Sequence, residues 1–175
     1  MRGGQAGSGV SLPLSSIQVQ KLAGSGSKVL LYSDLLEHST LESVFGNASK
    51  IALLYRQTPS FGHWIAIYKS PGGMVSFMDP YGKFIDSEIK RAAIPSLGQG
   101  DPVLIRLMLD YMDRGNKVEY NEKPLQKVGD DINTCGRFVG YYLQKAGKGM
   151  TMEEFQREFA KNGDAKIVKA TNGLF

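Results

Sequence analysis

The chain alternates short apolar runs with polar segments, and the lengths of these runs predict strands. Residues 50–56, 64–68 and 74–78 have the length and composition of buried strands. Residues 70–73, a Ser-Pro-Gly-Gly sequence, are a strong turn signal, so the second and third runs are expected to form an antiparallel hairpin. A further strand is expected at residues 117–120.

Longer segments carry apolar residues at the spacing of a helical face. The firmest of these helices opens with an N-cap acid and a proline, Asp101-Pro102. Thr151 and Glu154 fit a capping box at the start of the last one. The predicted helices span residues 33–45, 86–93, 101–114, 134–145 and 151–161. This order of elements predicts an α+β fold, with helices around a central mixed sheet of about three to five strands.

Glycine and serine set the N-terminal segment apart from the rest of the chain. They gather in residues 3–9 and 24–27, which resemble flexible linkers. We therefore expect residues 1–28 to form a flexible tail and residues 29–175 to form a single domain. Residues 11–22 are mildly apolar, which suits a segment that lies against that domain.

Composition narrows the class of protein. A chain of 175 residues is long enough for one domain with a hydrophobic core. We expect neither membrane insertion nor secretion, because the chain has no apolar stretch of about 20 residues and no apolar signal segment. A single cysteine excludes an internal disulfide and suits a reducing compartment. With only two histidines beside it, a structural Cys/His zinc site is nearly excluded, and we expect no metal.

Three residues in suitable chemical contexts suggest a thiol nucleophile with an oriented base. Cys135 starts a predicted helix, where unpaired N–H groups and the helix dipole favour a thiolate. His63 heads a predicted strand, and the hairpin would bring Asp79 back beside it to fix its tautomer. Taken singly, each has an ordinary structural explanation: a buried thiol, a hydrogen-bonded histidine, a turn aspartate before Pro80. Their combination points to a cysteine protease.

A tetrahedral oxyanion needs two preorganised donors. The backbone N–H of Cys135 is one candidate, and the second is the side-chain amide of either Gln126 or Asn133. We expect Gly136 to leave room for the substrate backbone and Trp64 to wall the cleft or to fill the core.

Three other polar residues are expected to have local roles. His38 lies on a predicted exposed helical face, between Glu37 and Ser39, and is interpreted as a surface residue. Asp86 and Asp101 are interpreted as turn or N-cap residues.

The order of the motifs resembles that of the adenovirus maturation proteases (the adenain family) and their wider clan of ubiquitin-like-protein proteases. The motifs are His63-Trp64, the Asp-Pro-Tyr-Gly turn at residues 79–82, Gln126 and Cys135-Gly136. The resemblance covers about residues 50–144. It implies a papain-like site on a circularly rearranged α+β fold, with the Gln126 amide in the oxyanion hole and Trp64 lining the cleft.

Two features depart from the family pattern. The loop between Gln126 and Cys135 is longer, with an apparent insertion at residues 128–131, so Asn133 stays open as the alternative donor. The chain also lacks a second cysteine through which a peptide activator could be disulfide-linked. We expect no required cofactor, and we leave DNA or a non-covalent peptide open as an activator, since the net charge is +4.

The resemblance implies a thiol endopeptidase that cleaves viral capsid or core precursor proteins during virion maturation. The expected sites are rich in glycine, of the Gly-Gly or Gly-x-Gly type. A virophage, a virus-like transposon or another double-stranded DNA virus would fit as its source. We expect a monomer inside the virion and the host cell, in a cytoplasmic virus factory or the nucleus. Contact of nucleic acid with its basic surface is left open, since such a net charge also serves solubility. Two alternatives stay open: a SUMO or ubiquitin-like deconjugating protease, and a non-catalytic domain that binds a polyanion or capsid protein.

The N-terminal segment contains two loose matches to such cleavage sites. One is residues 1–4 before Gln5, and the other is residues 22–25 before Gly26. They suggest self-processing, although any linker rich in glycine and serine meets so loose a rule equally well.

Overall fold

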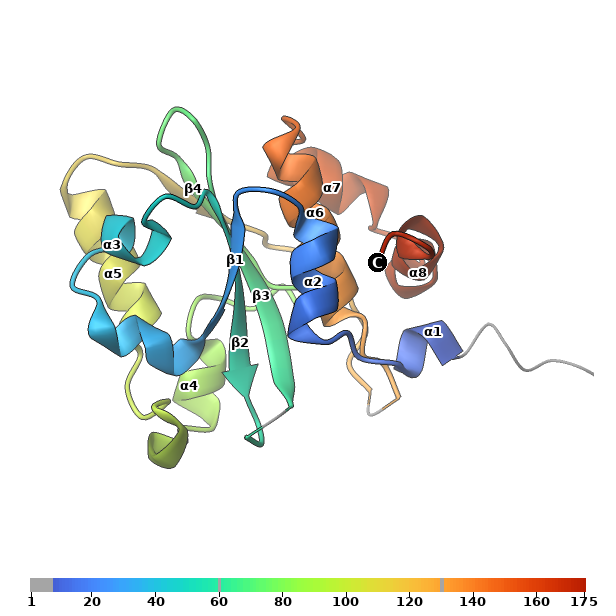
Figure 1. Cartoon of the computed structure of the whole chain (residues 1–175), viewed down its shortest axis with the longest axis horizontal. Helices are drawn as coiled ribbons and strands as arrows, with labels where there is room; N and C mark the ends of the chain where they lie inside the picture. Colours follow the sequence, from blue (N-terminus) through green and yellow to red (C-terminus); the bar gives the residue numbers. More distant parts are fainter. Residues whose placement is uncertain (1–7, 60, 130) are drawn as a thin grey trace, which may run out of the picture.

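The computed structural model describes residues 8–59, 61–129 and 131–175, and a mixed sheet forms their centre (Figure 1). Its strands, in the order in which they lie side by side, are β1 (Ser27–Leu31), β2 (Lys50–Arg56), β3 (Gly62–Lys69), β4 (Val75–Met78) and β5 (Val118–Tyr120). β2, β3 and β4 are antiparallel, whereas β1 and β5 run parallel to their neighbours. The expected mixed sheet is confirmed at five strands.

Helices cover both faces of the sheet (Figure 1). The first layer contains α1 (Ser8–Ser11), α2 (Ser16–Ala23), α6 (Cys135–Gly147), α7 (Met152–Glu158) and α8 (Gly163–Thr171). The second contains η1 (Tyr32–Glu37), α3 (Leu41–Phe45), α4 (Ser87–Arg91), η2 (Pro95–Leu97) and α5 (Val103–Asp113). The fold is thus mixed α/β. No helix in the described residues has the length and apolar character needed to cross a membrane.

The continuous apolar runs of the central strands follow from these two layers. Ile51 and Ile65 face the core shared with α3 and α5, whereas Ala52 and Ala66 face α6. Ala52 and Ala66 are register partners, and their small side chains allow α6 to pack close to the sheet. A sheet covered on both faces needs apolar residues at successive positions, so strict alternation is absent here.

The expectation that residues 1–28 form a flexible tail is wrong for most of that segment. α2 begins with a capping box between Ser15 and Gln18, and its Val19 and Leu22 are fully buried. Gly24 and Gly26 are not linker residues, because both adopt positive φ, 81° and 74°, in the tight turn that leads into β1.

The burial of α2 also bears on the two candidate processing sites. Leu22 and Ala23 are fully buried, so the second candidate is inaccessible to a protease while the chain is folded. The first candidate, at residues 1–5, lies outside the described residues.

Two further predictions need correction at the level of single elements. The predicted helix 33–45 is broken into η1 and α3, because Thr40 leaves the helical conformation and accepts a hydrogen bond from the Ser43 N–H at 3.2 Å. The helix expected at 101–114 begins at Val103, with Pro102 rather than Asp101 as its N-cap residue.

Candidate active site

His63 and Asp79 meet where the hairpin of β3 and β4 was predicted to bring them together. His63 lies at the start of β3, and Asp79 directly follows β4. The His63 Nε2–H donates a hydrogen bond to Asp79 Oδ1 at 2.7 Å. The side chains are 5% and 0% exposed, so the pair lies out of contact with bulk water.

Hydrogen bonds from two directions fix the Asp79 backbone and carboxylate. The Asp79 N–H donates to Asn121 Oδ1 at 2.8 Å, and Asn121 Nδ2 donates back to the Asp79 carbonyl at 2.6 Å. The Tyr81 N–H donates to Asp79 Oδ1 at 2.8 Å. Gly82 closes the turn at φ +68°, where a Cβ would lie 2.6 Å from the Pro124 nitrogen. These contacts hold Oδ1 of the carboxylate toward the imidazole.

Tyr81 stacks on the His63 ring, with centroids 4.4 Å apart and planes 20° from parallel. The Lys83 ammonium lies 5.1 Å from the Tyr81 ring centroid. The stacked ring restrains imidazole rotation, which the hydrogen bond to Asp79 alone would not prevent. The motif around Asp79 contained Tyr81, but nothing in the sequence indicated this contact.

Cys135 occupies the first turn of α6 and is 7% exposed. Its backbone N–H is among those that have no acceptor within the helix. The preceding residue, Thr134, donates through its hydroxyl to Asp164 Oδ1, and the Lys127 N–H donates to Asp164 Oδ2 at 3.0 Å. Asp164, in the first turn of α8, thus holds both ends of the loop that leads to Cys135.

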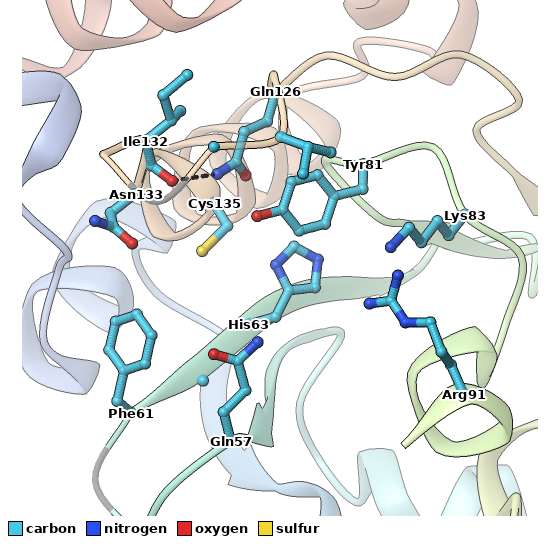
Figure 2. Close-up of a pocket in the computed structure, with 13 residues that line it drawn as sticks. Gln57, Phe61, His63, Tyr81, Lys83, Arg91, Gln126, Ile132, Asn133 and Cys135 are labelled. Carbon is cyan, nitrogen blue, oxygen red and sulfur yellow. Dashed lines mark hydrogen bonds between the residues drawn. The ribbon is translucent and has the colours of Figure 1, made fainter. Parts of the chain in front are cut away.

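The thiol of Cys135 and the imidazole of His63 face one another across a cavity (Figure 2). Burial of the imidazole, the largest influence, lowers the pKa of His63. Hydrogen bonds with Asp79 and Cys135 and their charges outweigh it and raise that pKa to about 10. A protonated imidazole beside a thiol favours a thiolate–imidazolium pair.

Gln126 lies at this cavity and is held to the Asp79 turn. Its backbone N–H donates to the Pro80 carbonyl at 2.9 Å, and its Nε2 donates to the Ile132 carbonyl at 3.1 Å. Since a side-chain amide carries two hydrogens, one remains for an oxyanion. Asn133 is oriented differently, because its Nδ2 donates to the Ser11 carbonyl at 2.9 Å. Asn133 likewise keeps one amide hydrogen and also lines the cavity, so the second donor stays open between the two; Gln126 is the one whose backbone is bonded to the Asp79 turn.

Two cavities meet at Cys135 and together form a cleft. One, of about 290 Å³, contains His63 and Gln126, and the other, of about 300 Å³, contains Leu14 and Trp64. The walls common to both are Phe61, Gly62, Asn133 and Cys135. Trp64 is placed at the cleft, as expected from the resemblance.

Gly136 does not line this cleft, so the expectation that it leaves room for substrate is wrong. A Cβ at Gly136 would lie 3.1 Å from a methyl carbon of Val19 and 3.2 Å from both Leu14 and Trp64. The missing side chain allows α6 to pack against the N-terminal segment.

The other candidate residues lie elsewhere. His38 is partly buried in a separate cavity beside η1 and α5, with its Nδ1 2.6 Å from Ser43 Oγ. Asp86 is the N-cap residue of α4, one of the two local positions expected for it, but its side chain does not cap that helix. The carboxylate is fully buried and accepts hydrogen bonds from Tyr32, Tyr55 and the Ile105 N–H.

One cluster has the spacing of a metal site. Single ligand atoms of His63, Asp79 and Glu88 lie within 4.8 Å of one another. Nε2 of His63 already donates to Asp79, and a cation would have to replace that hydrogen bond. We therefore interpret the three groups as an acid–base cluster, in which His63 and Asp79 are hydrogen-bonded and Glu88 lies beside them.

The chain is similar to a virophage protein and to a solved bacterial domain. No protein family model matches the chain. Uncharacterized protein V9 of Sputnik virophage is 29% identical over 147 residues, which cover 82% of this chain and 81% of V9. The solved central domain of the uncharacterized Lpg1148 protein from Legionella pneumophila is 18% identical, with a TM-score of 0.46 over 91% of this chain and 93% of that one.

Proposed function

We propose that this protein is a cysteine endopeptidase with a papain-like, adenain-like fold, which cleaves viral capsid or core precursor proteins. The observation that carries the proposal is the buried hydrogen bond from His63 Nε2 to Asp79 Oδ1, beside a cleft that His63 shares with Cys135. A base oriented by a carboxylate next to a nucleophile at a helix start is the arrangement that thiol catalysis requires. The similarity to a virophage protein supports a viral setting.

In the proposed mechanism, the Cys135 thiolate attacks the substrate carbonyl carbon while His63 holds the proton. The carbonyl oxygen becomes an oxyanion, which accepts hydrogen bonds from the Cys135 N–H and the Gln126 amide. Such a donor typically contributes about 3 kcal/mol to the transition state. The intermediate collapses to a thioester as His63 gives its proton to the leaving amine. Water then attacks the thioester with His63 as base, releasing the acid product and the thiol.

The shape of the cleft supports a preference for glycine beside the bond that is cut. Cys135 is only 7% exposed, and Phe61 and Asn133 wall both cavities next to it. A bulky substrate side chain would contact these walls before the carbonyl reached the thiolate, whereas glycine would not. Figure 2 shows Lys83 and Arg91 reaching toward one end of the cleft, which favours an acidic residue in the substrate there.

The test is digestion of co-encoded capsid proteins and a panel of Gly-Gly peptides, including ubiquitin-like C-termini, with and without DNA. We expect wild type to cleave at a glycine and Cys135→Ala to be inactive. His63→Ala should also be inactive, while His38→Ala, the matched control from a different cavity, should retain full activity. Full activity of Cys135→Ala would refute the mechanism. Exclusive cleavage of ubiquitin-like termini would replace the capsid substrate by a conjugate.

A further inference from the structure

A second carboxyl group lies behind the His63–Asp79 pair. Glu88, in α4, has both side-chain oxygens buried without a hydrogen-bond partner among the described residues. Oδ2 of Asp79 is also buried and has no hydrogen-bond partner among these residues. An ionised carboxylate only accepts hydrogen bonds, so two facing carboxylates can pair only when one of them carries a proton.

The geometry brings these two carboxyl groups together. Atoms of Glu88, Asp79 and His63 lie within 4.8 Å of one another. Burial is the largest influence on Glu88, followed by the charge of Asp79, and both raise its pKa; His63 opposes them, and the pKa lies at about 7. Close carboxyl groups in a site of low polarity behave in this way, because both cannot ionise without repulsion.

Four other titratable groups in the described part of the chain lie around Glu88. Tyr55 of β2 and Tyr81 of the Asp79 turn lie close enough to interact with its charge. Arg56 and Arg91 line a small cavity together with Glu88 and His63. Arg56 donates to the Leu97 carbonyl, and no ion pair joins Glu88 to either arginine among the residues that the structure describes.

We propose that protonated Glu88 donates a hydrogen bond to Oδ2 of Asp79 and thereby positions the carboxylate that orients His63. Glu88 is a positioning residue, since it lines the small cavity behind His63 and not the cleft that contains Cys135. With this bond, Asp79 accepts from His63 and Tyr81 at one oxygen and from Glu88 at the other.

Loss of the Glu88 proton changes the pair in two ways. Asp79 loses a donor at Oδ2, so its carboxylate is less firmly oriented. The new negative charge also binds the His63 proton more tightly, which slows proton transfer to the leaving amine. Both effects lower turnover as pH rises through neutrality. This consequence for activity rests on the proposed function, whereas the hydrogen bond itself does not.

The decisive experiment therefore reads the imidazole directly. In protein labelled with ¹⁵N-histidine, the His63 Nε2 proton is followed by NMR from pH 5.5 to 9, with His38 as an internal reference. We expect the chemical shift of this proton to show an inflection near pH 7 in wild type and in Glu158→Gln, an exposed control on α7. The shift should show no inflection in Glu88→Gln, because the amide of glutamine donates at every pH. An inflection that persists in Glu88→Gln, or is absent from wild type, overturns the proposal. So does one that disappears on adding EDTA, which would indicate a bound cation.

Peptide cleavage supplies the second measurement. We expect kcat/KM of wild type to fall about tenfold from pH 6 to 8.5, that of Glu88→Gln to stay level, and that of Glu88→Leu to be about tenfold low throughout. Thermal melting and iodoacetamide labelling of Cys135 establish that each variant is folded and has its nucleophile. If no variant cleaves or is labelled but the inflection behaves as expected, the protease proposal fails and the Glu88 assignment stands. If wild type and both Glu88 variants cleave with the same pH profile, the Glu88 assignment fails and the protease proposal stands.

Discussion

Asp79 and Asp86 are both fully buried and close in sequence, but their surroundings differ. The Asp86 carboxylate accepts from Tyr32 at 2.9 Å, from Tyr55 at 2.8 Å and from the Ile105 N–H at 2.7 Å. Among the described residues, the structure records hydrogen bonds to Asp79 at Oδ1 only, while Oδ2 is buried and Glu88 lies close by. A buried carboxylate whose hydrogen bonds are complete stabilises a fold, whereas one with an open oxygen can respond to protonation and to substrate.

The two aspartates also differ in what they connect. Burial raises the pKa of Asp86, and the hydrogen bonds from Ile105, Tyr55 and Tyr32 oppose that rise. These partners come from α5, η1 and β2, so Asp86 joins two elements of one helical layer to a strand of the sheet. Asp79 connects the sheet to the cleft. We therefore expect mutations at Asp86 to act on stability and mutations at Asp79 to act on activity.

The largest effect should come from Asp79→Asn. The amide can replace the carboxylate sterically but favours the wrong imidazole tautomer and does not stabilise its charged form, so kcat/KM should fall by about a thousandfold or more. Urea denaturation should show a stability change of less than about 1 kcal/mol. Activity at the wild-type level would remove Asp79 from the mechanism.

Gln126 extends the comparison, because its Oε1 is buried and has no partner among the described residues. Gln126→Ala should lower kcat by about a hundredfold with little change in KM, since an oxyanion donor acts in the transition state. Asn133→Ala, whose amide bonds the N-terminal segment, should stay within about threefold of wild type. A larger loss in Asn133→Ala would exchange the two assignments.

Asp86→Asn should give the opposite result to Asp79→Asn. Replacing the charged acceptor of three hydrogen bonds weakens each of them and leaves one N–H without an acceptor, which should cost about 3 kcal/mol of unfolding free energy. The specific activity of the folded fraction should be unchanged. Urea denaturation monitored by Trp64 fluorescence measures the unfolding free energy. Active-site titration combined with kinetics measures the specific activity of the folded fraction. A catalytic defect in fully folded protein would break the distinction between the two aspartates.

The smallest effects should distinguish the two tyrosines that bind Asp86. The Tyr32 hydroxyl also accepts from the Val103 and Leu104 N–H groups, so Tyr32→Phe should cost about 2 kcal/mol. Tyr55→Phe removes only its bond to Asp86 and should cost about 1 kcal/mol. Equal costs, measured by urea denaturation, would mean that the backbone bonds to Tyr32 contribute nothing net.

The sequence was sufficient wherever the relevant contacts are local. Residues 50–56 were predicted as a strand and form β2, and the turn signal at 70–73 gave the hairpin of β3 and β4. Because that hairpin is antiparallel, the approach of Asp79 to His63 followed from chain geometry and is confirmed at 2.7 Å.

Contacts between distant segments could not be predicted in this way. Glu88, Asn121 and Asp164 have no local signature, since their partners are determined only by tertiary packing. A turn or N-cap position was predicted for Asp86 and the structure confirms it as an N-cap, but its side-chain hydrogen bonds come from three remote elements and could not be predicted. Gly24 and Gly26 were predicted to be linker residues but lie in a tight turn with positive φ, because glycine is suited to both settings.

The position of Asp164 has a consequence for biosynthesis. Its carboxylate holds Lys127 and Thr134, yet it belongs to α8, which emerges from the ribosome after the strands and α6. A nascent chain can therefore complete its sheet while the loop before Cys135 still lacks its anchor. We expect the cleft to assemble only after α8 has been synthesised and has docked, so that chains still in translation are inert toward the proteins made beside them.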